Sequence, residues 1–205
     1  MASLWIDERD IKFQLNEVFN IGETILGKGR YADHDVDMCN MVLDQAQKFA
    51  EVEIAPTYPD EVHRKPVEAV FKDGKVYAPE SYHRLWKLYC EGGWMTTADS
   101  PEVGGQSFPF IIGAAVANMF LATNQAFLMY AGLSHGAARL MEDHFKNPLR
   151  DIIIEKMFSG QWAGTMCLTE PGAGSDLGIL KTTAKRNGDG TYSIVGTKCF
   201  ISAGD

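Results

Sequence analysis

One run near the C-terminal end of this chain constrains its fold more than any other segment: Met166-Cys167-Leu168-Thr169-Glu170-Pro171-Gly172-Ala173-Gly174-Ser175-Asp176. The apolar stretch that leads into it, residues 162–168, is typical of a β-strand. The run itself is a polar loop with two glycines, two hydroxyls and two carboxylates. Because glycine has no Cβ, such a loop lets backbone N–H groups and short hydroxyls approach a ligand closely.

The residues around the glycines exclude two commoner kinds of glycine-rich loop. A P-loop requires Lys-Ser or Lys-Thr after its last glycine, and Ser175-Asp176 stand there instead. A Rossmann dinucleotide loop requires Gly-x-Gly-x-x-Gly, but the third glycine comes one residue late, at Gly178. The two carboxylates disfavour bare phosphate, which prefers lysine or arginine nearby. The loop therefore suits a ligand with many neutral hydrogen-bonding groups along one edge, as a flavin ring has.

The residues after the loop predict strands and not the helix that a Rossmann fold requires. Residues 181–186 are rich in threonine, and Asn187-Gly188-Asp189-Gly190 is a strong turn signal. Two further β-prone segments follow, residues 191–195 and 198–202. The pattern predicts a β-meander.

The residues before position 160 predict helices. Residues 35–54 carry apolar side chains at helical spacing, with Asp35 as the cap or in the first turn and Pro56 after the end. Four more helices are predicted over residues 79–91, 110–120, 124–144 and 148–159. The middle pair is apolar enough to be buried on most sides, in the core or at a subunit interface.

These patterns divide the chain into three parts. Residues 1–34 form an N-terminal helical extension, whose amphipathic segment is expected to pack on its own domain or on a partner subunit. Residues 35–160 form an α-helical domain, with a loop or short hairpin over residues 58–78, and residues 161–205 begin a β domain. A sheet that is begun but not closed leaves an exposed edge. We therefore expect the front part of a longer protein.

Charge and composition limit the partners. A formal net charge of −8 over 205 residues disfavours nucleic acid and anionic membrane surfaces, which require a basic face. No signal peptide or membrane span is predicted, and the protein is expected to be cytoplasmic. The cysteines are predicted to be buried free thiols in a reducing compartment: Cys39, Cys90, Cys167 and Cys199. The histidines show no metal-binding spacing, and no metal site is predicted: His34, His63, His83, His135 and His144.

Three segments resemble the acyl-CoA dehydrogenases, FAD enzymes that introduce an α,β double bond into acyl-CoA thioesters. Residues 166–176 resemble the signature of that family, and Pro101-Glu102-Val103-Gly104-Gly105-Gln106 resembles its Pro-Glu-x-x-Gly-Gly loop. Residues 196–204 resemble its second flavin-contacting strand. The resemblance covers residues 35–205 and is greatest to the branch that contains 3-methylmercaptopropionyl-CoA dehydrogenase. It implies an α+β multidomain fold: an all-α N-terminal domain, the start of an antiparallel β-barrel-like domain, and a C-terminal helical domain absent from this chain.

The resemblance also implies which residues bind the cofactor. The residues that match flavin-contacting positions are Met166, Leu168, Thr169, Gly174, Ser175, Phe200, Ile201 and Ser202. Ser175 matches a position near both the FAD pyrophosphate and the acyl-CoA. The family usually has tryptophan and threonine where Phe200 and Ser202 stand, so the aromatic face and the hydroxyl are kept while the indole donor is lost.

The implied reaction is α-proton abstraction followed by hydride transfer to flavin N5. The family's catalytic carboxylate comes from its later helical domain, so the base is expected downstream of Asp205 and no catalytic residue is assigned here. Glu170 is instead expected to hold the loop through backbone hydrogen bonds. This chain alone is predicted to be inactive and to bind FAD weakly, because half of the hydrogen-bonding wall is missing.

The resemblance implies acyl-CoA as the substrate, within fatty acid metabolism, an electron-transfer flavoprotein as the acceptor, and a homo-oligomer. Two alternatives remain open at this point. One is an acyl-CoA oxidase, in which oxygen reaches the reduced flavin. The other is a non-catalytic binding or assembly module, if the protein ends at Asp205.

Overall fold

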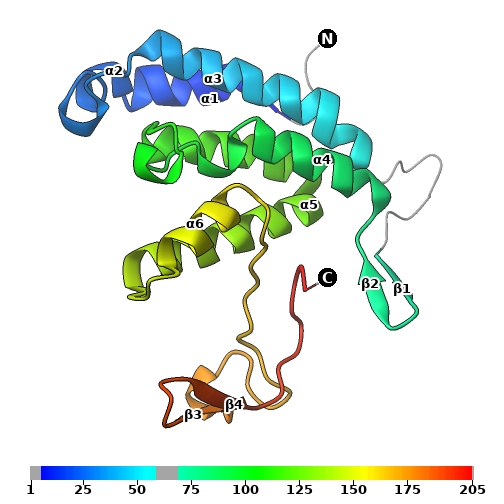
Figure 1. Ribbon diagram of the computed structural model, residues 1–205. Coiled ribbons are helices and arrows are strands. Elements are labelled where there is room, and N and C mark those ends of the chain that lie inside the picture. The colour runs from blue at the N-terminus through cyan, green and yellow to red at the C-terminus, as the bar shows by residue number, and fades with distance from the viewer. Residues whose placement is uncertain (1–5, 59–68, 205) are drawn as a thin grey trace.

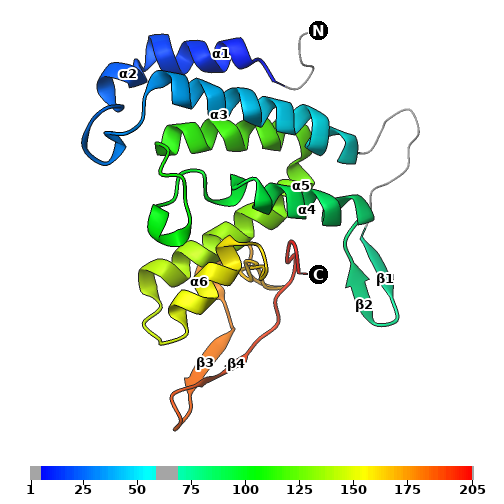
Figure 2. The same ribbon diagram turned by 45° about the horizontal axis from the view of Figure 1, so that its top comes forward.

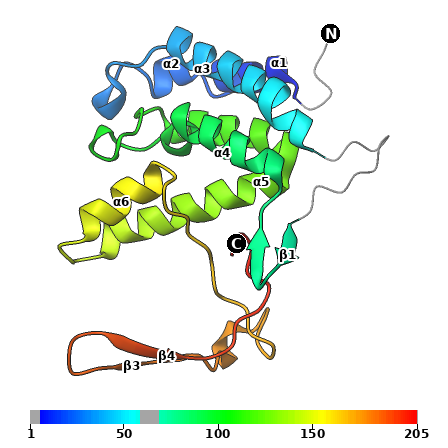
Figure 3. The same cartoon turned by 45° about the vertical axis from the view of Figure 1, so that its right-hand side comes forward.

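The computed structural model describes residues 6–58 and 69–204, in which stacked helices form a body with two projecting hairpins (Figure 1). The N-terminal helices lie on one side of this body, α4 lies in the middle with part of α5, and α6 lies on the other side (Figure 2). The β3–β4 hairpin stands away from the helices, and the C-terminal end of the chain returns toward them (Figure 3). Part of the loop predicted over residues 58–78, with Pro59, His63 and Pro66, lies outside the described residues.

The described part of the N-terminal extension forms four short helical elements: α1 (Glu8–Phe13), a π-helical turn η1 (Gln14–Val18), α2 (Ile21–Thr24) and a 3-10 turn η2 (Gly29–Tyr31). Leu15 and Ile21 are buried, and Lys12 forms ion pairs with Glu8 and with Asp44 of α3. Other apolar residues of the predicted amphipathic segment face solvent: Phe13, Val18 and Phe19. The extension therefore packs on its own helical body, through fewer apolar residues than expected.

Helix α3 (Val36–Phe49) confirms the helix predicted over residues 35–54. The Asp35 side chain caps it by accepting a hydrogen bond from the Met38 amide at 2.8 Å. The helix continues as a π-helical turn (Ala50–Ile54) and a 3-10 turn (Ala55–Thr57) that contains Pro56. Its buried residues are Cys39, Leu43 and Ala46.

Helices α4 (Glu80–Glu91) and α6 (Arg150–Phe158) also match their predicted positions. The two predicted central helices form one long helix, α5 (Phe110–His144), with non-helical backbone at Asn124 (φ −152°, ψ 90°). Aromatic side chains fill the space between α3, α4 and α5, and those that contact one another include Phe49, Tyr82, Tyr89, Trp94, Phe120 and Phe127.

By length and composition alone, α5 qualifies as a possible membrane span, as the core helix of a water-soluble protein also does. Within its most apolar stretch, 44% of the residues are buried inside the molecule. Phe120 and Phe127 contact rings of α3 and α4. The absence of a membrane span therefore stays a prediction.

Two antiparallel hairpins contain the regular strands of the described residues. Strand β1 (Val70–Lys72) pairs with β2 (Lys75–Tyr77), and β3 (Thr183–Arg186) pairs with β4 (Tyr192–Val195). The strands predicted over residues 162–168 and 198–202 are absent, so the predicted meander is wrong in part. Phe200 and Ala203 have left-handed backbone, with φ of 56° and 53°, which interrupts a strand.

The cysteines differ in burial. Burial raises the pKa of the Cys39 thiol to about 11, and the same cause raises the pKa of half-buried Cys90 to about 11. Cys199 is half-buried, but Cys167 is exposed, so the prediction of four buried thiols is wrong for Cys167. All four are free thiols.

Candidate functional site

The predicted ligand loop is built on a tight turn from Glu170 to Ala173. The Glu170 amide donates to the Ala173 carbonyl at 3.0 Å, and the Ala173 amide donates back to the Glu170 carbonyl at 3.1 Å. Both residues are buried, while Pro171 and Gly172 between them are exposed. The turn therefore exposes the glycine side of the loop and anchors its ends.

The Glu170 carboxylate organises the surroundings of this turn. It accepts hydrogen bonds from the Lys181 amide at 2.7 Å and from the Thr182 amide at 2.9 Å. The Lys198 ammonium lies 2.9 Å from the same carboxylate and also donates to the Leu168 carbonyl at 2.9 Å. With its oxygens occupied, Glu170 holds the loop together, as the sequence predicted, and is unsuited to act as a base.

The same contacts lower the pKa of Glu170 from its usual value of 4.5 to about 2. The groups beside the carboxylate are the Thr182 side chain, the Lys181 amide, the Lys198 ammonium and the Thr182 amide. The Thr182 amide makes a well-formed hydrogen bond, whereas the Thr182 hydroxyl is buried without a partner of its own. We therefore attribute the low pKa mainly to the two amides and to Lys198.

This arrangement predicts how the loop responds to acid. Because the folded-state pKa lies below the unfolded-state value, ionised Glu170 stabilises the loop fully above pH 4.5, and this stabilisation is lost as the pH falls through about 2. In an NMR titration, the amide resonances of Lys181 and Thr182 should shift with a midpoint of about 2. The shift should disappear in Glu170→Gln, and a wild-type midpoint near 4.5 would contradict the assignment.

The C-terminal segment of the described chain lies beside residues 165–169, which lead into the loop. The Cys199 amide donates to the Thr169 carbonyl at 3.0 Å, and the Thr165 hydroxyl donates to the Ser202 carbonyl. Lys198 bonded to Leu168 adds a third contact. These contacts bring the two groups of predicted flavin-binding residues, one near Thr169 and one near Ser202, next to each other.

Most of the predicted site residues are accessible. Met166 is 60% exposed and Phe200 is 90% exposed, and the remaining exposed members are Leu168, Gly174, Ser175 and Ser202. Thr169 and Ile201 are half-buried. Within residues 69–204, the side-chain hydroxyls of Thr169, Ser175 and Ser202 make no hydrogen bond. Donors without protein partners, beside exposed apolar and aromatic surface, fit the edge and face of a flavin.

The glycines of the loop leave the space that such a ligand requires. A Cβ added at Gly172 or at Gly174 would meet no atom within 4 Å. Asp176 is turned into the protein backbone, where its side chain accepts a hydrogen bond from the Gly178 amide at 3.0 Å. Asp176 thus accepts a hydrogen bond but keeps its charge, whereas the charge of Glu170 is paired with Lys198.

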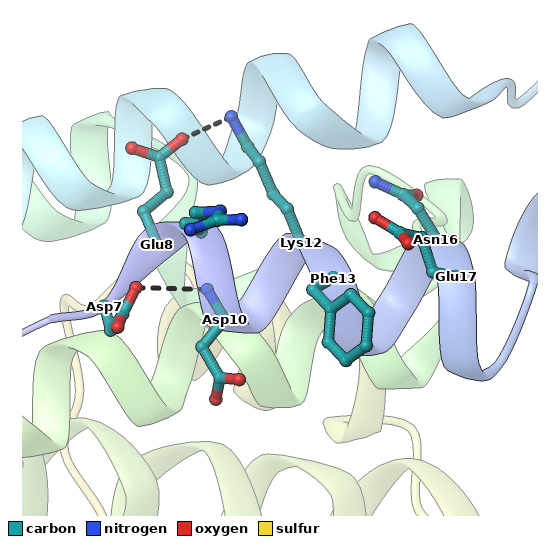
Figure 4. Close-up of a pocket in the computed structure, with 8 residues that line it drawn as sticks. Asp7, Glu8, Asp10, Lys12, Phe13, Asn16 and Glu17 are labelled. Atoms are coloured by element: carbon teal, nitrogen blue, oxygen red, sulfur yellow. Dashed lines mark hydrogen bonds and ion pairs between the residues drawn. The ribbon is translucent and has the colours of Figure 1, made fainter.

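Two hollows lie elsewhere and contain none of the predicted site residues. A groove of about 670 Å³ runs along α1, where Glu8 pairs with Lys12 and Asp7 caps the Asp10 amide (Figure 4). A larger cavity of about 880 Å³ lies between the two halves of α5 and the loop before α5. At its rim, His135 Nε2 lies 2.7 Å from buried Asp99. No sequence pattern indicated this contact, because 36 residues separate the two side chains.

The described residues contain no group of three or more His, Cys, Asp or Glu side chains placed to hold a metal ion. The predicted lack of a metal site stays a prediction, since His63 lies outside the described residues.

Comparison with known proteins gives related sequences over most of the chain. It is 32% identical over 177 residues to 3-methylmercaptopropionyl-CoA dehydrogenase of Ruegeria pomeroyi, covering 85% of this chain and 29% of that protein. It is also 32% identical to a broad-specificity linear acyl-CoA dehydrogenase of Mycobacterium tuberculosis, covering 96% of this chain and 32% of that protein. The chain thus spans about a third of the length of these relatives. No family model matches it.

The fold has relatives among solved structures. An acyl-CoA dehydrogenase from Bacillus anthracis, solved in complex with FAD, superposes with a TM-score of 0.62 at 24% identity. The match covers 83% of this chain and 27% of that one. This likeness confirms the coarse fold class, a mainly helical chain with few strands.

Proposed function

The chain is homologous to the acyl-CoA dehydrogenases, and on that premise we propose that it forms the helical part and the start of the flavin-binding part of an FAD-dependent enzyme that oxidises acyl-CoA thioesters. The observation that carries this proposal is the joining of two sequence motifs in space. The contacts of Lys198 and Cys199 with Leu168 and Thr169 bring the second motif beside the first.

The residues that would hold FAD are those whose donors and apolar faces are accessible. Thr169 and Ser202 offer hydroxyls to the ring, Gly174 and Ser175 offer an open loop to the pyrophosphate, and Phe200 offers an aromatic face. When bound, FAD supplies the hydride acceptor for the oxidation. The role of this chain is then to bind, orient and polarise, with Ser175 also contacting the acyl-CoA.

The remaining parts of the proposal extend beyond this chain. The α-proton would be removed by a carboxylate from a later helical domain, the β domain would be completed as a barrel, and an electron-transfer flavoprotein would accept the electrons. The protein would be a cytoplasmic homo-oligomer. The names of the two relatives suggest 3-methylmercaptopropionyl-CoA and linear acyl-CoA thioesters as substrates to assay first.

FAD binding by the purified chain tests the proposal. Binding is measured by flavin fluorescence polarisation, and we expect the wild-type chain to bind FAD weakly. Thr169→Val and Ser175→Ala should each raise the dissociation constant roughly fivefold, because each loses one hydrogen bond of about 1 kcal/mol. Thr191→Ala is the matched control, since its hydroxyl bonds to Asp189 in the distant hairpin turn. If Thr191→Ala weakened binding as much as the other two, the loop would not be the flavin site.

Oxygen consumption separates the dehydrogenase from the oxidase. We expect the complete enzyme to reduce an artificial electron acceptor when acyl-CoA is added, without consuming oxygen. Rapid oxygen consumption under the same conditions would favour the oxidase.

A further inference from the structure

The segment that connects the helical body to the ligand loop, residues 160–164, is held by three different helices. The Trp86 indole of α4 donates to the Gly160 carbonyl at 2.9 Å. The Gly164 amide donates to the Ser134 hydroxyl of α5 at 3.1 Å. The Trp162 amide donates to the Lys156 carbonyl of α6 at 2.9 Å, and the Lys156 ammonium lies 5.5 Å from the centre of the Trp162 ring. The connector is therefore fixed at both ends and in the middle.

The two glycines of this connector are required because neighbouring helix side chains approach them closely. A Cβ on Gly160 would lie 2.2 Å from the Cys90 sulfur, and Gly160 also has left-handed backbone (φ +74°). A Cβ on Gly164 would lie 2.6 Å from the Ala137 Cβ and 3.0 Å from the end of Met157. The connector thus fits against the helices without room for another methyl group.

Of these contacts, the hydrogen bond between Ser134 and Gly164 lies nearest to the ligand loop. The Ser134 side chain is completely buried (0% exposed), and its oxygen accepts from a residue 30 positions away in the chain. Only one residue, Thr165, separates Gly164 from Met166 at the start of the ligand loop. The β3–β4 hairpin stands apart from the helices, whereas the C-terminal end of the chain returns toward them (Figure 1, Figure 3). The direction in which the loop leaves the body is therefore set at Gly164.

We propose that Ser134 and Gly164 are positioning residues, which fix the flavin-binding loop relative to the helical body so that an acyl group and the flavin meet at a constant separation. This inference rests on the proposed function for its consequence but not for its geometry. The rate of a reaction between two bound groups depends on how they are placed relative to each other, and displacing one of them by about 1 Å can reduce the rate on the order of a hundredfold.

A distance measurement tests the positioning directly. One nitroxide label is attached to the exposed native Cys167 and a second to a cysteine introduced at exposed Met41 of α3, in a background in which half-buried Cys90 and Cys199 are replaced by serine. Pulsed electron double resonance of the wild-type pair should give one narrow distance distribution. Ser134→Ala should broaden it roughly twofold, because the freed connector samples more directions. Ser193→Ala, which removes an exposed hydroxyl bonded to Asn187 in the β3–β4 hairpin, should leave it unchanged.

A compensating pair of substitutions separates positioning from general damage. Gly164→Ala should shift or broaden the distribution, and adding Ala137→Gly, which removes the methyl group that the new Cβ meets, should restore it. A broad wild-type distribution, no change in Ser134→Ala, or no recovery in the double variant would each overturn the proposal.

Titration of the same variants with FAD distinguishes this inference from the proposed function. We expect Ser134→Ala to change the visible circular dichroism of the bound flavin while the fold, measured in the far ultraviolet, stays intact. If the distance distribution responds as expected but no variant binds FAD, the positioning role stands and the proposed function fails. If FAD binds but the distances do not respond, the reverse holds.

Discussion

Gly105→Ala is expected to lower the free energy of unfolding by about 3 kcal/mol or more, because the new methyl group would overlap backbone atoms. A Cβ at this position would lie 2.1 Å from the Asp99 carbonyl oxygen, 2.3 Å from its carbon and 2.8 Å from the Ser100 oxygen. These are backbone atoms and cannot rotate away. The Gly105 amide donates to the Ser100 carbonyl at 2.8 Å and the Ser107 amide to the Asp99 carbonyl at 2.9 Å, so the loop is also fixed from both sides.

A second glycine provides the matched control in urea unfolding. Gly136 lies exposed within α5, and a Cβ there would meet no atom within 4 Å. Gly136→Ala should therefore raise the free energy of unfolding by about 1 kcal/mol, the difference in helix propensity. Equal urea midpoints for Gly105→Ala and the wild type would show that Gly105 does not approach the Asp99 carbonyl so closely.

Local sequence patterns predicted the helices well, because their determinants lie within a few residues. The cap at Asp35 and the apolar spacing after it specify α3, and α4 ends at Glu91, the last residue of its predicted range, with Gly92 as its C-cap. The glycines of residues 101–106 marked a loop, but the sequence did not show that Gly105 is there because of the Asp99 carbonyl. That reason depends on how the loop folds back on itself.

The candidate site was predictable only as far as its residues form a known motif. The sequence indicated that Glu170 holds the loop, but its partners Lys181, Thr182 and Lys198 are 11 to 28 residues away, beyond the reach of local patterns. The strands predicted from β-propensity failed around Phe200 for a similar reason. Propensity describes how well a side chain fits a paired sheet, and pairing depends on a neighbouring strand that local sequence does not specify.

Asn124→Ala is expected to lower the free energy of unfolding by about 2 to 4 kcal/mol, because it leaves several buried polar groups without partners. Asn124 is 1% exposed at the kink of α5. Its side-chain oxygen accepts from the Phe127 amide at 3.1 Å and the Tyr82 hydroxyl at 3.3 Å, and its nitrogen donates to the Thr57 hydroxyl at 2.9 Å. One side chain thus joins α4, α5 and the end of the α3 segment.

Asn118→Ala is the control for this change, because Asn118 is exposed on the same helix and its replacement should alter stability by no more than about 0.5 kcal/mol. Similar urea midpoints for the two variants would contradict the role assigned to the buried amide. The kink also determines where the second half of α5 points, and that half carries Ser134. Loss of Asn124 should therefore broaden the distance between labels at Met41 and Cys167 as well, even where the chain remains folded, because the helix that holds Gly164 would itself be displaced.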